Sequence, residues 1–236
     1  MIDLPTFQEA NLPTHLDLPS EVPEGYSLFN RFQFYQSQFM RASFYLPNYP
    51  PEQILISNRF TICYDEHHPN WYTHPNWFLV QGVPRIYKPR SKSMSYMIWE
   101  EKVIPLIVVE IIRLETEVSF GDSRDENESV PPTSWEVYEQ ILQVPYCVVF
   151  NYDTDRLRVF KLVDNRYQEL SQLEECVWLP ELDLGLGLWS GIFDGFGRTW
   201  MRWFDTSGHW IPTLFEQDQL KQRQQLAELG QQQRAE

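Results

Sequence analysis

The 236-residue chain has few cysteines, no long hydrophobic run and no excess of basic residues. Its cysteines, Cys63, Cys147 and Cys176, are widely spaced and odd in number. They therefore predict neither a disulfide framework nor a zinc motif, and we expect a reducing, cytoplasmic compartment. No apolar run approaches the about 20 residues that cross a membrane, so no transmembrane helix is expected. The amino terminus has neither a basic start nor an apolar core, which argues against a secretory signal.

Basic residues are outnumbered, because 19 Lys and Arg face 33 Asp and Glu, giving a formal net charge of −14. Sequence-independent binding to nucleic acid depends on Lys and Arg that neutralise phosphates. The charge balance therefore disfavours tight, non-specific DNA binding. A basic stretch at residues 85–92 could still touch a phosphate backbone, although such a stretch is more often simply solvated.

Apolar residues, by contrast, are abundant: 42% of the chain is hydrophobic and 15% aromatic. A wholly disordered chain is excluded, since disorder goes with few aromatic residues. The length favours one domain with appendages. We predict a proline-punctuated extended arm at residues 1–25, a domain at 26–213 and a Gln-rich helical tail at 214–236, which could bind a protein partner or form a homodimer.

The hydrophobic pattern predicts a mixture of helices and strands. Apolar residues at helical spacing predict a helix at 26–43, and Ser134 could cap a second helix through residue 143. Residues 180–197 are rich in Gly and Trp and are interpreted as irregular. The predicted strands lie at 54–64 (one or two), 77–80, 95–99, 105–112, 146–150, 157–163 and 167–170. A local meander together with a helical crossover indicates an α/β or α+β fold with a mixed sheet flanked by helices.

Glu110 is the residue that departs most from its surroundings, because it lies inside the most apolar strand, at 105–112. Strand alternation places it on the same face as Val108 and Ile112. A carboxylate in such a run costs several kcal/mol unless it is paired, hydrogen-bonded, protonated or metal-bound. Glu110 is thus a metal ligand or catalytic acid, or a structural carboxylate paired with Arg or with backbone N–H groups.

Several stretches around Glu110 resemble one family. They are PNWFLVQGVP at 75–84, SYMIWEEK at 95–102, PLIVVEII at 105–112, YEQILQVPY at 138–146, VVFN at 148–151, VFKLVDNRY at 159–167 and VWLPELDLGLG at 177–187. Their order and spacing resemble the Uma-type restriction endonuclease domain family, a bacterial branch of the PD-(D/E)XK nuclease superfamily. The resemblance covers about residues 25–215 and implies a restriction-endonuclease-like fold.

The resemblance also implies a site. In the superfamily an Asp and a Glu from neighbouring strands hold a divalent ion, usually Mg²⁺, and a nearby Lys orients the attacking water. Carried over, the Glu is Glu110, but the Asp position holds Asn76 and the Lys position, four residues before Tyr138, holds Ser134. The resemblance therefore implies a degraded catalytic set, with endonuclease activity weakened or lost and Mg²⁺ needed only if activity remains.

Two alternatives remain open. One is a non-catalytic interaction protein on the same fold. The other is an active nuclease with a relocated site, built from Asp65, Glu110 and either Asp122 or Asp125. In this relocated site, Asp65 would end a strand that lies beside the strand of Asn76, and it could serve there as a metal ligand.

Two further groups have plainer interpretations. The histidines His67, His68 and His74 lack zinc-site spacing and are expected to be solvated loop residues. A set of C-terminal aromatic residues could form a base-stacking platform, but core packing is favoured. That set is Trp189, Phe193, Phe196, Trp200, Trp203, Phe204 and Trp210.

Overall fold

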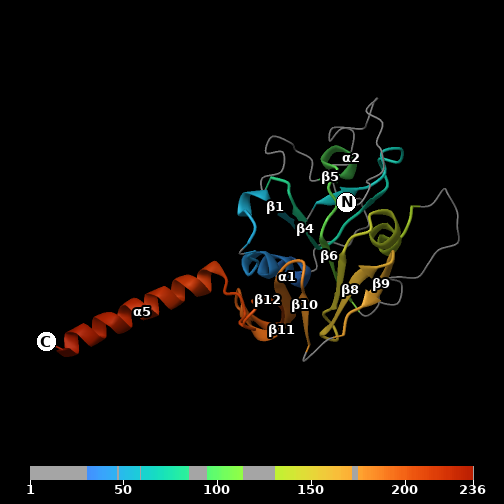
Figure 1. Ribbon diagram of the computed structural model, residues 1–236. Helices are drawn as coiled ribbons and strands as arrows, with labels where there is room; N and C mark the ends of the chain where they lie inside the picture. Colours follow the sequence, from blue (N-terminus) through green and yellow to red (C-terminus); the bar gives the residue numbers. More distant parts are fainter. Residues whose placement is uncertain are drawn as a thin grey trace.

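A six-stranded mixed sheet lies at the centre of the molecule in this computed structural model, which describes residues 31–46, 48–58, 60–84, 95–113, 131–171 and 175–235 (Figure 1). Its strands, in spatial order, are β1 (Ile54–Ser57), β4 (Trp77–Gln81), β6 (Ile107–Ile112), β7 (Tyr146–Asn151), β8 (Arg156–Val163) and β9 (Arg166–Glu169). β6 and β7 run parallel, whereas the other neighbours are antiparallel. The predicted mixed sheet is therefore confirmed.

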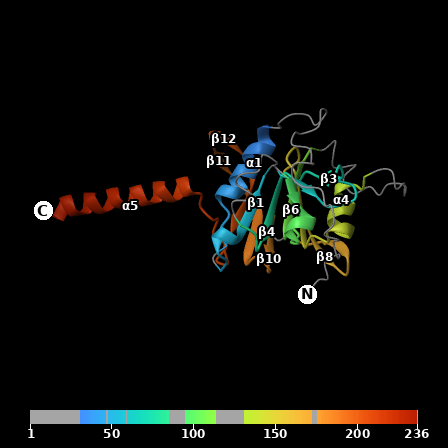
Figure 2. The same cartoon turned by 90° about the horizontal axis from the view of Figure 1, so that it is seen from above.

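One face of this sheet is covered by helix α1 (Arg31–Ala42) and by a three-stranded sheet of β10 (Cys176–Leu179), β11 (Leu184–Phe193) and β12 (Phe196–Phe204). Phe39 and Met40 of α1 pack in one buried cluster with Val109 of β6 and Trp200 of β12. Figure 2, seen from above, shows α1 and β11–β12 on this side of the sheet. Burial of so many aromatic and branched side chains is the main force that joins the two layers.

The opposite face is covered by a short helical segment and a second small sheet. The small sheet contains β3 (Tyr72–Thr73), β2 (Thr61–Cys63) and β5 (Ser95–Met97), in that order. The predicted alternation of strand β6 is confirmed, since Val108 and Ile112 pack here while Val109 packs on the other side. Two short helical segments lie outside these layers' strands, namely α2 (Ile98–Glu101) and a 3-10 turn at Pro51–Gln53.

The helix between β6 and β7 differs from the prediction in its cap and its winding. Thr133, not Ser134, is the cap: its side chain accepts from the Glu136 N–H while the Glu136 carboxylate accepts from the Thr133 N–H. This reciprocal pair satisfies two otherwise unpaired donors at the helix start. Only one α turn follows (α4, Ser134–Glu136), and the chain then continues as a π-helix at Val137–Ile141. The wider π turn is the form that often appears at functional sites.

The prediction of irregular structure at residues 180–197 is wrong, because β11 and β12 form a long antiparallel hairpin there. The glycines in β11 make room for aromatic rings: a side chain at Gly185 would collide with the Phe204 ring, and one at Gly191 with Trp189. Aromatic side chains that cover glycines in this way stabilise a strand that looks irregular by composition. The aromatic residues are core, as favoured, since Trp200 and Trp203 are fully buried.

Replacing Gly185 by alanine should therefore destabilise the hairpin. The added methyl group would occupy the space of the Phe204 ring, which is itself packed against Trp178 and Trp210. We expect a loss of about 1–3 kcal/mol in the free energy of unfolding, measured by urea denaturation. Gly197→Ala is the matched control, because its nearest neighbour would be Ile192 at an ordinary contact distance of 3.8 Å. Equal losses for the two variants would contradict this account of β11.

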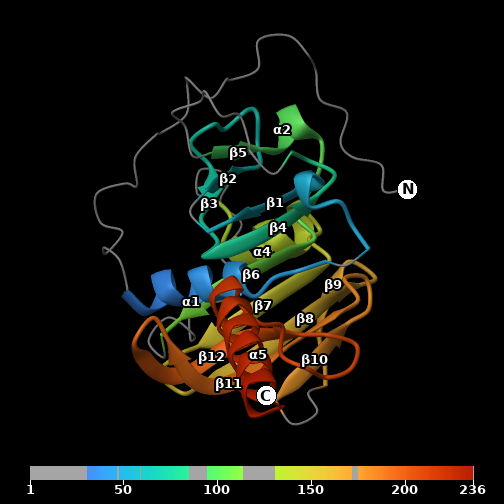
Figure 3. The same ribbon diagram turned by 90° about the vertical axis from the view of Figure 1, so that its left-hand side faces the viewer.

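Helix α5 (Leu214–Ala235) begins where the predicted tail begins and projects away from the body (Figures 1 and 2). In Figure 3 it points toward the viewer in front of β10–β12. Within the described residues, no helix combines the length and apolarity needed to cross a membrane. The predicted arm at 1–25, the basic stretch at 85–92, and Asp122 and Asp125 lie outside the described residues.

Candidate functional site

The register between β4 and β6 brings Asn76 to Glu110. Trp77 pairs with Val109 and Phe78 with Val108, so the same register, extended by one residue, sets Asn76 opposite Glu110. The strands stop pairing at that point. Instead of a backbone partner, the Asn76 side chain supplies Oδ1, which accepts the Ile111 N–H at 2.6 Å. Asn76 and Glu110 thus lie side by side at the end of the β4–β6 ladder.

Helix α1 completes the strand edge at the same place. Gln33 donates its side-chain amide to the Ile111 carbonyl, and the Ser37 hydroxyl lies 3.1 Å from the Asn76 carbonyl oxygen. Two side chains therefore satisfy the Ile111 backbone groups that β4 leaves unpaired. Asn76 consequently has a structural task that does not depend on any bound ion.

Glu110 is held by a tyrosine from the π-helix. The Tyr138 hydroxyl donates to Glu110 Oε1 at 2.7 Å, and Tyr138 itself is fully buried. Neither of the structural partners considered for Glu110, an arginine or backbone N–H groups, is found among the described residues. A neutral hydroxyl stabilises the carboxylate less than a cation would, so the cost of burying it is only partly offset.

Ser134 joins the same group through a residue that the sequence did not single out. Thr73 of β3 places Oγ1 at 2.7 Å from the Tyr138 hydroxyl and at 3.0 Å from Ser134 Oγ. A chain of hydroxyl groups therefore runs from Ser134 through Thr73 and Tyr138 to Glu110. Thr73 had no sequence signal, because no spacing rule links a two-residue strand to a helix 61 positions later.

Burial sets the protonation of this group. It raises the pKa of Glu110 to about 7, although the hydrogen bond from Tyr138 lowers it. Burial also raises the pKa of Tyr138 well above its usual value, and the nearby Glu110 charge adds to the effect. Cys147 of β7 lies on the same face of the sheet as Glu110. Burial and the nearby Glu110 charge both raise the pKa of its thiol. It is a buried thiol, and buried cysteines of this kind are chemically inert.

Asp65 lies elsewhere, and its predicted position is wrong. Strand β2, which precedes it, pairs with β3 and β5 in the small sheet rather than with β4. Its carboxylate is bonded locally, to the His67 N–H at 2.8 Å and to His68 Nδ1 at 2.7 Å. The side-chain hydrogen bond with His68 contributes to lowering the Asp65 pKa, although partial burial, the largest single influence, opposes it.

The histidines are mostly the solvated loop residues that were expected. His67 and His68 are exposed. His74 differs, because it is partly buried and its Nε2 lies 3.0 Å from Thr61 Oγ1, and burial lowers its pKa.

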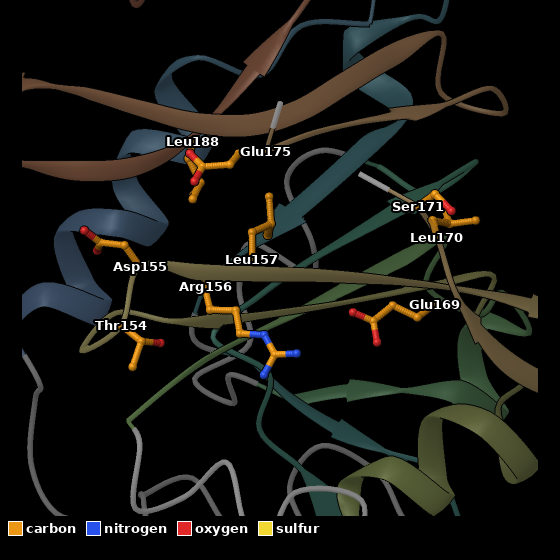
Figure 4. A pocket seen from close by; sticks show the side chains of 9 residues that line it. All are labelled: Thr154, Asp155, Arg156, Leu157, Glu169, Leu170, Ser171, Glu175 and Leu188. Atoms are coloured by element: carbon orange, nitrogen blue, oxygen red, sulfur yellow. The ribbon is translucent and has the colours of Figure 1, made fainter. Parts of the chain in front are cut away.

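A separate hollow of about 690 Å³ opens between β8, the end of β9 and the β10–β11 sheet (Figure 4). Leu157 lies at its centre, and the Arg156 and Glu169 side chains face each other beside it. Glu169 is already paired with Arg158 at 2.8 Å, and these hydrogen bonds lower its pKa. The hollow is not lined by Asn76, Glu110 or Ser134, so it is distinct from the candidate site.

The oxygen atoms that could act as metal ligands at the candidate site do not fit a tightly held Mg²⁺ ion. That cation prefers several oxygen ligands, usually with more than one negative charge. Here Glu110 supplies one carboxylate, Asn76 Oδ1 already accepts an N–H, and Ser134 Oγ is engaged by Thr73. In the described part of the chain, no three His, Cys, Asp or Glu side chains come together in a group suited to a metal ion.

Removing the Thr73 hydroxyl should destabilise the fold through Tyr138. Thr73→Val keeps the shape of the side chain but deprives Tyr138 and Ser134 of their shared partner. A buried polar group left without its partner costs about 1–3 kcal/mol, so we expect that loss in urea unfolding. Thr73→Ser is the control, because it retains the hydroxyl. A valine variant as stable as the serine variant would show that the hydroxyl chain contributes nothing.

The mixed sheet with its parallel β6–β7 pair, and the acid at the end of the β4–β6 ladder, define a restriction-endonuclease-like fold. A family model described as "Uma2: Putative restriction endonuclease" matches residues 37–193. The chain therefore belongs to the Uma2 family, within the PD-(D/E)XK superfamily, whose members generally use divalent metal ions. No curated protein matches the chain significantly.

Proposed function

We propose that this protein is a Uma2-family nuclease-fold protein in which metal-dependent phosphodiester cleavage is weakened or lost. The observation that carries this proposal is the set of side chains around Glu110. It contains one carboxylate, an amide engaged by the Ile111 backbone and three hydroxyl groups, with no lysine among its members. Catalytic groups that work as a unit fail together when members are missing.

The direct test is a plasmid-nicking assay with Mg²⁺ or Mn²⁺. We expect little or no nicking by the wild-type chain, and no difference between it and Glu110→Ala. The net charge of −14 also argues for weak binding to the plasmid. Clear nicking that disappears in Glu110→Ala would overturn the proposal and support a relocated active site.

A non-catalytic interaction module on the same fold is the second candidate. The observation that favours it is α5, whose outward side chains include exposed Leu214, Phe215, Leu220 and Leu226. Single exposed apolar residues are common, but Phe215 and Leu226, 11 residues or about three turns apart, lie on the same side of this projecting helix, where a partner could cover them.

A further inference from the structure

The first turn of α5 is fixed firmly to the domain. Thr213 and Glu216 cap the helix reciprocally, and the Glu216 carboxylate also binds Arg202 at 2.6 Å. Arg202 is almost fully buried and its guanidinium stacks over the rings of Phe39 and Trp189. The direction in which α5 leaves the body is therefore set by the core.

The rest of α5 has no support from its own domain. Beyond Gln217, no hydrogen bond or ion pair joins the helix to another element among the residues that the structure describes. Phe215 is 71% exposed and Leu226 is 69% exposed. Most helical stability in proteins comes from a covered apolar face, and the outer part of α5 has no such cover from its own domain.

A groove of about 980 Å³ lies at the base of α5, between its first turn, the end of α1 and the segment after β12. Its apolar lining includes Phe44, Tyr45, Ile211 and Leu214. Asp183 also lines the groove and is exposed, and no described residue forms a hydrogen bond or ion pair with its carboxylate, although its backbone N–H donates to the Pro180 carbonyl. The other rim charges are engaged: Arg41 binds the Ile56 carbonyl, and Asp205 accepts backbone N–H groups of Ser207 and His209.

The helix and the groove complement each other but cannot meet within one molecule, because α5 points away from its own base (Figures 1 and 3). The helix offers Leu226 for the apolar lining. It also offers Arg223, which is exposed. Arg223 precedes Leu226 by three residues, so the two side chains are neighbours on the helix surface. An aliphatic group and a cation thus match an apolar groove that carries a free carboxylate.

We propose that two copies of the chain form a two-fold dimer in which the α5 helices lie antiparallel. Leu226 of each copy enters the groove of the other, and Arg223 pairs with Asp183 across the interface. Both contacts occur twice, because a two-fold axis makes each copy present the same surface to the other. The proposal does not depend on whether Glu110 binds a cation.

The strong negative charge of the chain should confine the dimer contact to α5 and the groove. Each copy carries a net charge of −14, so two copies repel each other over most of their surfaces. A pairing of Arg223 with Asp183 occurs twice in the dimer and supplies attraction where the surfaces meet. We expect a dissociation constant in the micromolar range, as for other small interfaces.

Sedimentation equilibrium of the full chain tests the proposal. We expect a monomer–dimer equilibrium that Leu226→Asp abolishes. Arg223→Glu alone and Asp183→Lys alone should each weaken the dimer at least about tenfold, because each leaves like charges opposed. The double variant should restore the wild-type affinity to within about threefold, which only a direct pairing explains.

Controls separate this result from misfolding. Lys102 already occupies a left-handed backbone conformation, like that of Asp183, so lysine is tolerable at that position. Gln224→Glu adds one negative charge to α5, as Leu226→Asp does, but away from the proposed contact, so it should leave the dimer nearly unchanged. Circular dichroism melting checks the fold of every variant. A chain that stays monomeric at high micromolar concentration overturns the proposal. So does a dimer that survives Leu226→Asp, or a double variant that is no tighter than the single ones.

Discussion

The double variant Asn76→Asp, Ser134→Lys should bind Mg²⁺ or Mn²⁺ at least about tenfold more tightly than the wild type, as measured by calorimetry. Asn76 lies opposite Glu110 in the strand register, so the new carboxylate would add a second negative oxygen donor beside the first. An Asp can still accept the Ile111 N–H that Asn76 accepts now. The lysine would restore a cation near the hydroxyl chain, where Ser134 Oγ now meets Thr73.

The two single variants, Asn76→Asp and Ser134→Lys, show how much each position contributes to the gain in cation affinity. Asn76→Asp alone should account for most of the gain in cation affinity, because charge on the ligands dominates the binding of hard cations. Asn165→Asp is the matched control, since it adds the same charge in the β8–β9 turn, outside the site. If the double variant and the Asn165 control bind the ion equally weakly, positions 76 and 134 have been placed incorrectly.

The Glu110→Gln variant should be more stable than the wild type at pH 8 and about equally stable at pH 4. The folded-state pKa of Glu110 is raised from 4.5 to about 7. Below pH 4.5 the carboxyl is protonated in both the folded and the unfolded chain, so its full contribution is present. Between pH 4.5 and 7 the unfolded chain releases the proton first, and the folded state loses stability as the pH rises.

The size of this loss follows from the shift. Each pH unit corresponds to about 1.4 kcal/mol, so the wild type should lose up to about 3 kcal/mol relative to Glu110→Gln by pH 8. Urea denaturation of both proteins across this range measures the difference. The side-chain oxygen of the glutamine in Glu110→Gln can still accept from the Tyr138 hydroxyl, so this variant keeps the hydrogen bond and loses only the charge. A stability difference that does not vary with pH would show that Glu110 titrates normally.

Much of the fold could be predicted from local pattern. The faces of β6 were assigned correctly around Glu110, because successive side chains of a strand point to opposite faces of the sheet. The β11–β12 hairpin could not be predicted in this way. Gly185 and Gly191 suggested irregular structure, and only the rings of Phe204 and Trp189 above them show why a strand forms.

The candidate site was likewise predictable in part from the sequence. The resemblance identified positions 76, 110 and 134. The structure sets Asn76 opposite Glu110 by strand register and links Ser134 to Glu110 through Thr73 and Tyr138. Thr73, which connects two of them, depends on the packing of β3 against the π-helix, and such long-range contacts leave no periodic trace in a sequence. Asp65 was misplaced for a related reason, because a strand's sequence does not reveal which sheet it joins.

The Asn76 side chain has a consequence for how such proteins diverge. Its oxygen completes the strand edge, and its other terminal atom is the sole heavy atom that distinguishes it from aspartate. Exchange of that nitrogen for oxygen keeps the hydrogen bond from the Ile111 N–H while changing the charge beside Glu110. A single substitution at this position could therefore alter how such a protein binds a cation while the edge between the two strands stays complete.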